Sequence, residues 1–134
     1  MYSKLETIKV RDVMTRGVIT VPITATVREI CKIIAENKIS AVVVVLPDGE
    51  MIGVISETDL ILKIDSVKNI DEATAENIMQ TSNIKTIDPD ASVADALRIM
   101  KENLIHRLIV AHEIVKRPVG IITATDIIRL IAKS

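Results

Sequence analysis

The sequence contains two copies of one pattern, and a duplication constrains the fold of a chain more than any local signal. The segment VRDVMT at residues 10–15 matches AENIMQ at 75–80, and residues 18–40 match residues 83–106. GVISETDLI at 53–61 matches GIITATDII at 120–128, with every position 67 residues apart. Because the register holds over most of the chain, we expect two copies of one fold, at residues 10–64 and 75–134.

Each copy is predicted to have the element order β-α-β-β-α. VITV at 18–21 and IKTI at 84–87 are expected to be short strands, and helical spacing of apolar residues predicts helices at 26–37 and 92–103. A hairpin follows in each copy, around the turns LPDGE and HEIVKR. A short helix should close each copy, from Glu57 to about Ile64 and from Ala124 to about Ala132. This order indicates an α/β fold, sandwich-like in the α+β sense.

Composition limits the classes of protein that remain. Apolar residues make up 49% of the 134 residues and the mean hydropathy is +0.37, which favours a globular chain whose apolar runs are too short for a bilayer. Tyr2 is the only aromatic residue, so the core must be aliphatic and bases cannot stack on aromatic side chains. A net charge of −1 gives no overall field for nucleic acid or anionic membranes.

The remaining segments predict little chemistry of their own. Residues 1–9 are expected to form an N-terminal arm, and the charged residues 65–74 a solvated linker between the copies. Cys31 is the only cysteine, which excludes an internal disulfide, and it falls on an apolar helix stripe, where we expect a core thiol. The N-terminus lacks the features of a secretory signal, so we expect a cytoplasmic protein.

The strongest chemical signal is a motif that ends a strand and begins a helix in each copy. It runs from Gly53 through Ser56 to Asp59, and from Gly120 through Thr123 to Asp126. Such a junction suits a phosphate or ribose, because backbone N–H groups are free there and a carboxylate can accept two hydroxyl hydrogen bonds.

A second interpretation of the same residues needs no ligand. Ser/Thr-x-x-Asp is the spacing of a capping box, in which the side chains satisfy the first N–H groups of a helix. Thr26-x-x-Glu29 and Ser92-x-x-Asp95 have the same spacing at the other two predicted helices. Spacing alone therefore favours a cap.

The duplicated pattern as a whole resembles a tandem pair of CBS (cystathionine-beta-synthase) domains, known together as a Bateman module. The resemblance covers nearly the whole chain and rests on Gly-x-x-Ser/Thr-x-x-Asp occurring twice in register, with IHRL at 105–108 in the second copy. It implies two repeats related by a pseudo-two-fold axis. It also implies that the clefts between them bind adenosine compounds such as AMP, ADP, ATP or S-adenosylmethionine, as a regulatory ligand and not as a required cofactor.

The resemblance carries over to individual positions of this chain. It implies that Asp59 and Asp126 bind ribose hydroxyls, and that Ser56 and Thr123 lie near the ribose or phosphate. Strand backbone would surround the adenine at Ile19, Thr20, Ala41, Val42, Ile84, Lys85, Thr86, Arg107 and Leu108.

The two cations of IHRL form a separate expectation. In a strand, Ile105 and Arg107 would face one side and His106 and Leu108 the other. The run resembles one in the regulatory subunits of energy-sensing kinases, where its cations contact nucleotide phosphates. We expect His106 and Arg107 to point toward opposite clefts and bind phosphate. The alternative is a strand end whose polar tips simply reach water.

Departures from the family pattern make the two copies unequal. Ile109 stands where the family usually has proline shortly after the arginine, and Ser40-Ala41 replaces the His-Arg pair in the first copy. Leu62 corresponds to Arg129. We therefore expect one good nucleotide site and one weak or vacant site, without an indication of which is which.

Other chemistry finds little support in the sequence. His106 and His112 lack companion ligands at metal spacing, so we expect no metal site. No phosphate loop or nucleophile–base set is visible, so we expect no enzyme.

Three functions remain, in this order: an adenosine-ligand sensor that signals to a partner protein, a non-binding structural dimerisation module, and a nucleic-acid binder with a local basic patch. A homodimer is expected, joined through an exposed aliphatic helix face.

Overall fold

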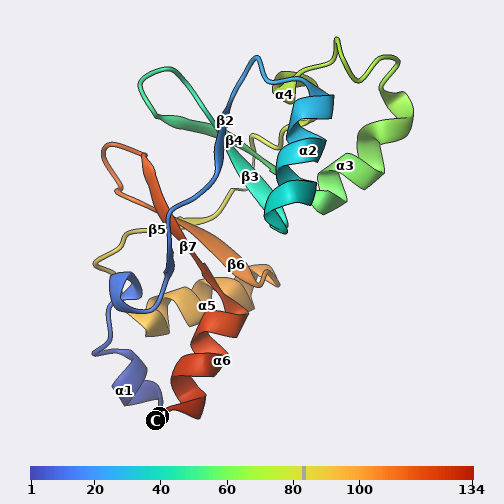
Figure 1. Ribbon diagram of the computed structural model, residues 1–134. Coiled ribbons are helices and arrows are strands. Elements are labelled where there is room, and N and C mark those ends of the chain that lie inside the picture. Colours follow the sequence, from blue (N-terminus) through green and yellow to red (C-terminus); the bar gives the residue numbers. More distant parts are fainter. Residues whose placement is uncertain (83) are drawn as a thin grey trace. The chain divides into compact units, whose positions relative to one another are not determined.

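The computed structural model describes residues 1–82 and 84–134, and it divides into two compact units (Figure 1). One unit is formed by Ile19–Ile84. The other combines Met1–Val18 with Lys85–Ser134. The chain therefore exchanges segments between its copies: residues 10–18 join the unit of the second copy, and residues 75–84 join the unit of the first.

The unit of residues 19–84 contains a three-stranded sheet in the order β2-β3-β4. Strand β2 (Thr20–Pro22) is parallel to β3 (Ala41–Val45), which is antiparallel to β4 (Met51–Ser56). Gln80 forms an isolated bridge to Val54 on β4. The helices of this unit are α2 (Val27–Asn37), α3 (Glu57–Lys63), the 3₁₀ turn η2 (Ile64–Ser66) and α4 (Ala75–Ile78).

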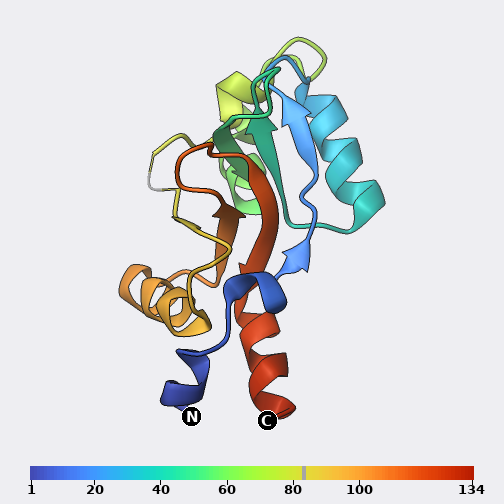
Figure 2. The same cartoon turned by 90° about the vertical axis from the view of Figure 1, so that its left-hand side faces the viewer.

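The second unit repeats this arrangement with one strand more, in the order β1-β7-β6-β5. Strand β5 (Thr86–Ile87) is parallel to β6 (Arg107–Ala111), which is antiparallel to β7 (Pro118–Thr123), and β1 (Thr15–Arg16) pairs antiparallel with β7. The helices are α1 (Tyr2–Leu5), the 3₁₀ turn η1 (Val10–Asp12), α5 (Val93–Asn103) and α6 (Ala124–Ala132). Figure 2 shows both chain ends at one end of this unit.

The predicted order β-α-β-β-α is confirmed in both copies, and the fold is a mixed α/β fold. The short strands begin two residues later than predicted, at Thr20 and Thr86. Strand β1 was not predicted, because two residues are too few to show an alternating pattern. Its counterpart in the other unit is the bridge at Gln80, so the two sheets share one plan.

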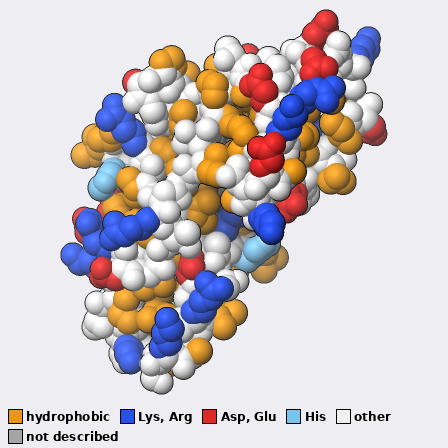
Figure 3. Space-filling model, viewed as in Figure 1, with side chains coloured by type: hydrophobic (Ala, Val, Ile, Leu, Met, Phe, Trp, Pro, Cys, Tyr) orange, Lys and Arg blue, Asp and Glu red, His pale blue; other side chains and the backbone are white. Residues whose placement is uncertain are grey.

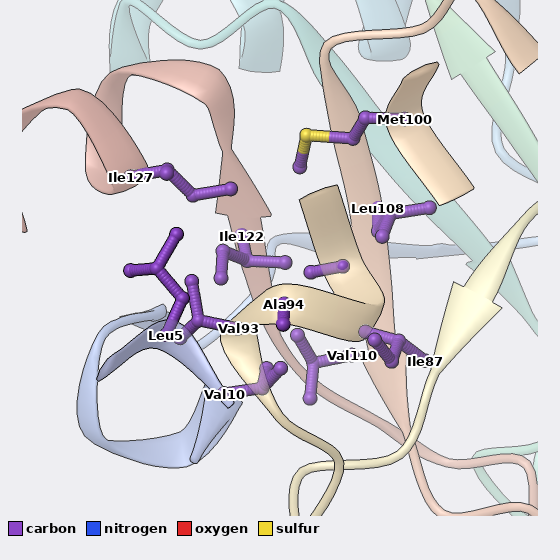
Figure 4. Close-up of a cluster of buried hydrophobic side chains, with 11 residues drawn as sticks. Leu5, Val10, Ile87, Val93, Ala94, Met100, Leu108, Val110, Ile122 and Ile127 are labelled. Atoms are coloured by element: carbon purple, nitrogen blue, oxygen red, sulfur yellow. The ribbon is translucent and has the colours of Figure 1, made fainter. Parts of the chain in front are cut away.

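Each unit has its own aliphatic core. In the unit of residues 19–84, Ile30, Ile55 and Ile78 are fully buried. In the second unit, side chains from α1, α5, α6 and the sheet point toward one another around Leu108 and Ile122 (Figure 4). Branched aliphatic side chains fill both cores, as expected for a chain without Trp or Phe.

The two long helices begin and end in the same way, which shows the duplication at the level of the backbone. The side chains of Thr26 and Ser92 accept hydrogen bonds from the third residue of α2 and α5 respectively. Lys38 and Leu104 end these helices in the left-handed region, at φ of 53° and 52°. At both positions, the left-handed conformation turns the chain sharply from the helix toward the strand that follows.

Residues 65–74 are not the solvated linker that their charge suggested. Val67, Ile70 and Ala73 pack against the core of the unit. The backbone N–H of Arg28 donates to Ile70 O at 3.0 Å, while its guanidinium pairs with Asp71 through Nε and Nη2. The segment thus lies along the first turn of α2, and its charged and other polar side chains, such as Asn69, reach water.

Candidate functional site

The first motif lies where β4 ends and α3 begins, and its side chains form a complete capping box. Oδ2 of Asp59 accepts hydrogen bonds from Ser56 N at 2.8 Å and from Ser56 Oγ at 2.9 Å, and Ser56 Oγ accepts one from Asp59 N at 3.2 Å. Both residues are half-buried. The box places a carboxylate at the strand–helix junction with its second oxygen, Oδ1, turned away from the cap.

The second motif repeats the box between β7 and α6. Oδ2 of Asp126 accepts from Thr123 N at 2.9 Å, and Thr123 Oγ1 accepts from Asp126 N at 3.2 Å. Asp126 is more deeply placed, with 9% of its surface exposed. Its Oδ1 accepts a long hydrogen bond of 3.4 Å from Thr15 Oγ1 on β1.

The capping interpretation is therefore correct for both motifs, and it distinguishes them from the other predicted boxes. Thr26 and Ser92 accept hydrogen bonds from the backbone N–H groups of Glu29 and Asp95. In the described part of the chain, the two acidic side chains accept no bond in return from the backbone N–H of Thr26 or Ser92. The full box at Asp59 and Asp126 fixes the carboxylate and leaves it able to accept further bonds.

The structure brings four of the predicted adenine-contacting positions next to the first junction. Ala41 pairs with Ser56, and Val42 with Ile55, across the hairpin. Thr20 is in register with Val43, whose N–H donates to Ile19 O at 3.1 Å. The Val42 side chain belongs to the core, so this residue can offer a ligand only its backbone. Ile84 is the last residue of this unit.

The second junction has the same neighbours in its own unit. Arg107 pairs with Thr123, and Thr86 with Ile109, whose N–H donates to Lys85 O at 3.4 Å. Ala124 N donates to His106 O at 2.9 Å, as Glu57 N does to Ser40 O at the first junction. Leu108 is fully buried in the core and likewise has only its backbone to offer.

The faces predicted for the run IHRL are partly wrong. Leu108 and Val110 belong to the core, so Arg107 and Ile109 lie on the opposite face of β6. Ile105 was expected on the face of Arg107, but it packs against the core, because β6 begins only at Arg107. His106 is exposed and Arg107 is half-buried. The strand end thus carries an exposed histidine and a half-buried arginine beside the second junction.

Cys31 is exposed, and the expectation of a core thiol was wrong. It lines a pocket of about 570 Å³ between α2 and α3 with Ile34, Ala35, Lys38, Ile39, Ser40, Glu57, Leu60, Ile61 and Ile64. The residue lies at the margin of the apolar stripe of α2, whose buried members are Val27, Ile30 and Ile34. Spacing identifies the apolar face of a helix, but it does not show which residues at the edge of that face are buried by neighbouring elements.

Thr15 is the residue near the motifs that sequence reasoning missed. The only available signal was its position directly after Met14 in the matched segments VRDVMT and AENIMQ, where the other copy has Gln80. Sequence comparison of the copies could not show that this segment crosses to the unit of the second copy.

The described residues contain neither a metal-binding cluster nor a membrane-spanning helix. Within residues 1–82 and 84–134, no three His, Cys, Asp or Glu side chains lie together as they would around a metal ion. No helix in the same residues is both long and apolar enough to cross a membrane.

The match to a family model shows which protein family the chain belongs to. The model of the CBS domain matches twice, at residues 10–66 and 75–133. The chain belongs to the CBS domain family. Its two matches form a tandem CBS pair, and each match contains one of the two strand–helix junctions.

Curated relatives agree with this assignment. The chain is 39% identical over 130 residues to the uncharacterized protein MJ1232 of Methanocaldococcus jannaschii, covering 97% of this chain and 42% of the relative. It is 30% identical to hypoxic response protein 1 of Mycobacterium tuberculosis, covering 89% of this chain and 82% of that protein. The chain spans about a third to two thirds of the length of the first four curated relatives.

Solved structures share the fold of this CBS pair. The CBS domain pair of protein MJ0100, in complex with 5′-methylthioadenosine and S-adenosyl-L-methionine, matches with a TM-score of 0.79 and 26% identity over 93% of this chain and 96% of that one. Hypoxic response protein I, solved with two coordinated zinc ions, matches with a TM-score of 0.77 and 29% identity over 90% of this chain and 97% of that one.

Proposed function

We propose that this CBS pair is a regulatory sensor that binds an adenosine-containing ligand and signals to a partner protein. The observation that carries the proposal is the pair of carboxylates, Asp59 and Asp126, that a full capping box holds at equivalent strand–helix junctions. A carboxylate fixed in this way can accept hydrogen bonds from two neighbouring hydroxyls without reorganising. Vicinal hydroxyls on a ribose have the matching geometry.

The ligand class is supported by the surroundings of the junctions and by one relative. The MJ0100 pair is described in complex with two adenosine compounds. In this chain, backbone at Ile19, Thr20, Ala41 and Val42, and at Lys85, Thr86 and Arg107, lies next to the two junctions and offers N–H and C=O groups to the edge of a base. We propose AMP, ADP, ATP or S-adenosylmethionine as the ligand, bound as a signal and not as a required cofactor.

The cations of the second copy favour a phosphorylated ligand. His106 and Arg107 meet the second junction through their own backbone, because His106 O accepts from Ala124 N and Arg107 pairs with Thr123. An arginine fork can bind two phosphate oxygens. The first copy has Ser40 and Ala41 at the same positions. In this proposal, the cations act on the charged end of the ligand, while the carboxylate acts on the ribose.

We further propose that the protein is a homodimer in the cytoplasm and has no catalytic activity of its own. The last helix of each copy exposes aliphatic side chains at equivalent positions, Ile61 and Ile64 on and after α3, and Ile128 and Ile131 on α6. Figure 3 shows hydrophobic side chains, in orange, reaching the surface between charged ones. Exposed aliphatic side chains repeated in this way favour an interface.

The second candidate is a structural dimerisation module that binds no ligand. It is favoured by the capping bonds, because Ser56–Asp59 and Thr123–Asp126 already stabilise α3 and α6 without one. A third class, nucleic-acid binding, would show as retention on polynucleotide at low salt that is lost as salt increases.

Calorimetric titration of the folded, nucleotide-free protein against AMP, ADP, ATP and S-adenosylmethionine tests the proposal. We expect saturable binding of at least one compound, reduced at least tenfold when Asp59→Asn and Asp126→Asn are combined. Asparagine keeps the cap, as Asn77 shows by accepting from Thr74 N at 2.8 Å at the start of α4.

Asp95→Asn is the matched control, because Asp95 occupies the same helix position in α5 but lies at no junction. It should bind as the unmodified protein does. Absence of binding across the whole panel would favour the structural module.

A further inference from the structure

The two junctions differ in how their carboxylates are already bonded. At Asp59, both side-chain hydrogen bonds within the described residues go to Oδ2, and none goes to Oδ1. At Asp126, Oδ2 accepts from Thr123 N and Oδ1 accepts from Thr15 Oγ1. Within the described residues, one carboxylate therefore has an oxygen without an internal donor, whereas each oxygen of the other already accepts one hydrogen bond and has one lone pair left.

Thr15 is held in this position by its own surroundings. It lies on β1, in register with Ile121, and Gly17 N donates to Val119 O at 3.1 Å just after it. Its carbonyl oxygen approaches Gly120 so closely that a Cβ on that glycine would lie 2.6 Å away. Pairing with β7 thus fixes the backbone of Thr15, so the hydroxyl leaves Asp126 only by rotation of its own side chain.

Among the described residues of the other copy, Asp59 has no such contact. Gln80 takes the place of Thr15, with its backbone bridged to Val54 on β4. Its side-chain Nε2 donates to Ser82 O at 3.0 Å and not to Asp59. The difference follows from a threonine in one copy and a glutamine in the other.

We propose that Thr15 is a specificity-determining residue, which occupies the outer oxygen of Asp126 and makes the second junction the weaker of two ribose sites. This inference rests on the function proposed above. A ligand hydroxyl must share Oδ1 of Asp126 with the Thr15 hydroxyl or displace it, whereas no donor among the described residues competes for Oδ1 of Asp59. The burial of Asp126 acts in the same direction, because only 9% of its surface is exposed to an incoming ligand.

The inference is tested by isolating the second junction with Asp59→Asn and then removing the hydroxyl with Thr15→Val. Valine keeps the branched shape that suits β1. In the Asp59→Asn background, we expect Thr15→Val to increase affinity for the adenosine ligand about threefold to tenfold. This is the lower part of the range for a hydrogen bond to a charged group, because the bond from Thr15 to Asp126 is long. Adding Asp126→Asn should remove the gain.

Two controls separate this effect from a general change in the protein. Thr15→Ser keeps the hydroxyl and should leave the affinity of the background unchanged. Gln80→Val alters the equivalent position of the other unit and should also leave it unchanged. Thermal unfolding of each variant checks that the fold is retained.

The outcomes distinguish the inference from the proposed function. Binding by the unmodified protein, with no gain from Thr15→Val or an equal gain from Gln80→Val, would overturn the role of Thr15 alone. A larger loss of affinity from Asp126→Asn than from Asp59→Asn would also overturn it. No binding by any variant, including the unmodified protein, would overturn both.

Discussion

Met79 lies directly against Gly53, so closely that a Cβ on the glycine would come within 2.7 Å of the methionine sulfur. The same relationship recurs between Met14 and Gly120, where the sulfur would be 2.8 Å away and the Thr15 carbonyl oxygen 2.6 Å. In both units, the exchanged segment therefore crosses the hairpin at a glycine of β4 or β7. These contacts hold the exchanged segments beside the two motifs.

Adding a methyl group at these glycines should destabilise the protein. We expect Gly53→Ala to decrease the free energy of unfolding by about 1–3 kcal/mol, because the methyl group overlaps the Met79 side chain. Gly120→Ala should cost more, because its close neighbour is backbone and cannot rotate away. Urea unfolding measures both, and combining Gly53→Ala with Met79→Ala should recover part of the loss. Equal stability of the single variants and the unmodified protein would contradict the contact.

A matched pair of core truncations tests the equivalence of the two units. Ile55 and Ile122 are corresponding residues, 67 positions apart, and neither has exposed surface. We expect Ile55→Ala and Ile122→Ala each to lower the free energy of unfolding by about 2–5 kcal/mol. Ile114→Ala, at a position with 93% of its surface exposed, is the control and should change the free energy of unfolding by less than about 0.5 kcal/mol.

The pair of Arg28 and Asp71 predicts a small dependence of stability on pH. The hydrogen bond from Arg28 holds the pKa of the Asp71 carboxyl below its ordinary value. A lowered pKa in the folded state gives stability above the unfolded pKa of about 4, which is lost as the pH falls through the folded value. The urea midpoint of Asp71→Asn should therefore lie slightly below that of the unmodified protein at pH 7.

The difference between these two proteins should shrink as the pH falls below about 4 and Asp71 becomes protonated. It should also shrink at high salt, because the pair is exposed. A difference that stayed constant with pH would show that the aspartate acts through some contact other than the ion pair.

The proposed homodimer makes a prediction about exposed apolar side chains. Ile61 and Ile128 have 75% and 64% of their surface exposed and occupy corresponding positions. Replacing both with glutamate should convert a dimer to a monomer, because charge cannot be buried in an aliphatic interface without a partner. Light scattering after gel filtration measures the mass directly. A monomeric unmodified protein would exclude the dimer at the concentration used.

The duplication allowed much of this fold to be predicted from the sequence. A register preserved over long segments predicted the helices at Val27–Asn37 and Val93–Asn103 and both hairpins. The capping boxes at Asp59 and Asp126 were also predictable, because their geometry is local and depends on spacing within one turn of helix.

Features that depend on distant parts of the chain were not predictable in the same way. Thr15 contacts Asp126 although 111 residues separate them, and no local pattern encodes that contact. The exposure of Cys31 depends on how α2 packs against its neighbours. The packing of Ile70 against the core could not be predicted, because charged residues surround it in the sequence. Their side chains reach water, while Ile70 O accepts a hydrogen bond from Arg28 N on α2.

The most direct test of the central claim, that a fixed carboxylate binds a ribose diol, is to change the ligand and not the protein. The compound of the panel that binds the unmodified protein most tightly should be compared by calorimetry with its 2′-deoxy and 2′,3′-dideoxy analogues. We predict that affinity falls with each hydroxyl removed, by about tenfold or more in total. Each removal takes away a hydrogen bond that the carboxylate is positioned to accept. Equal affinity for the three compounds would contradict the claim.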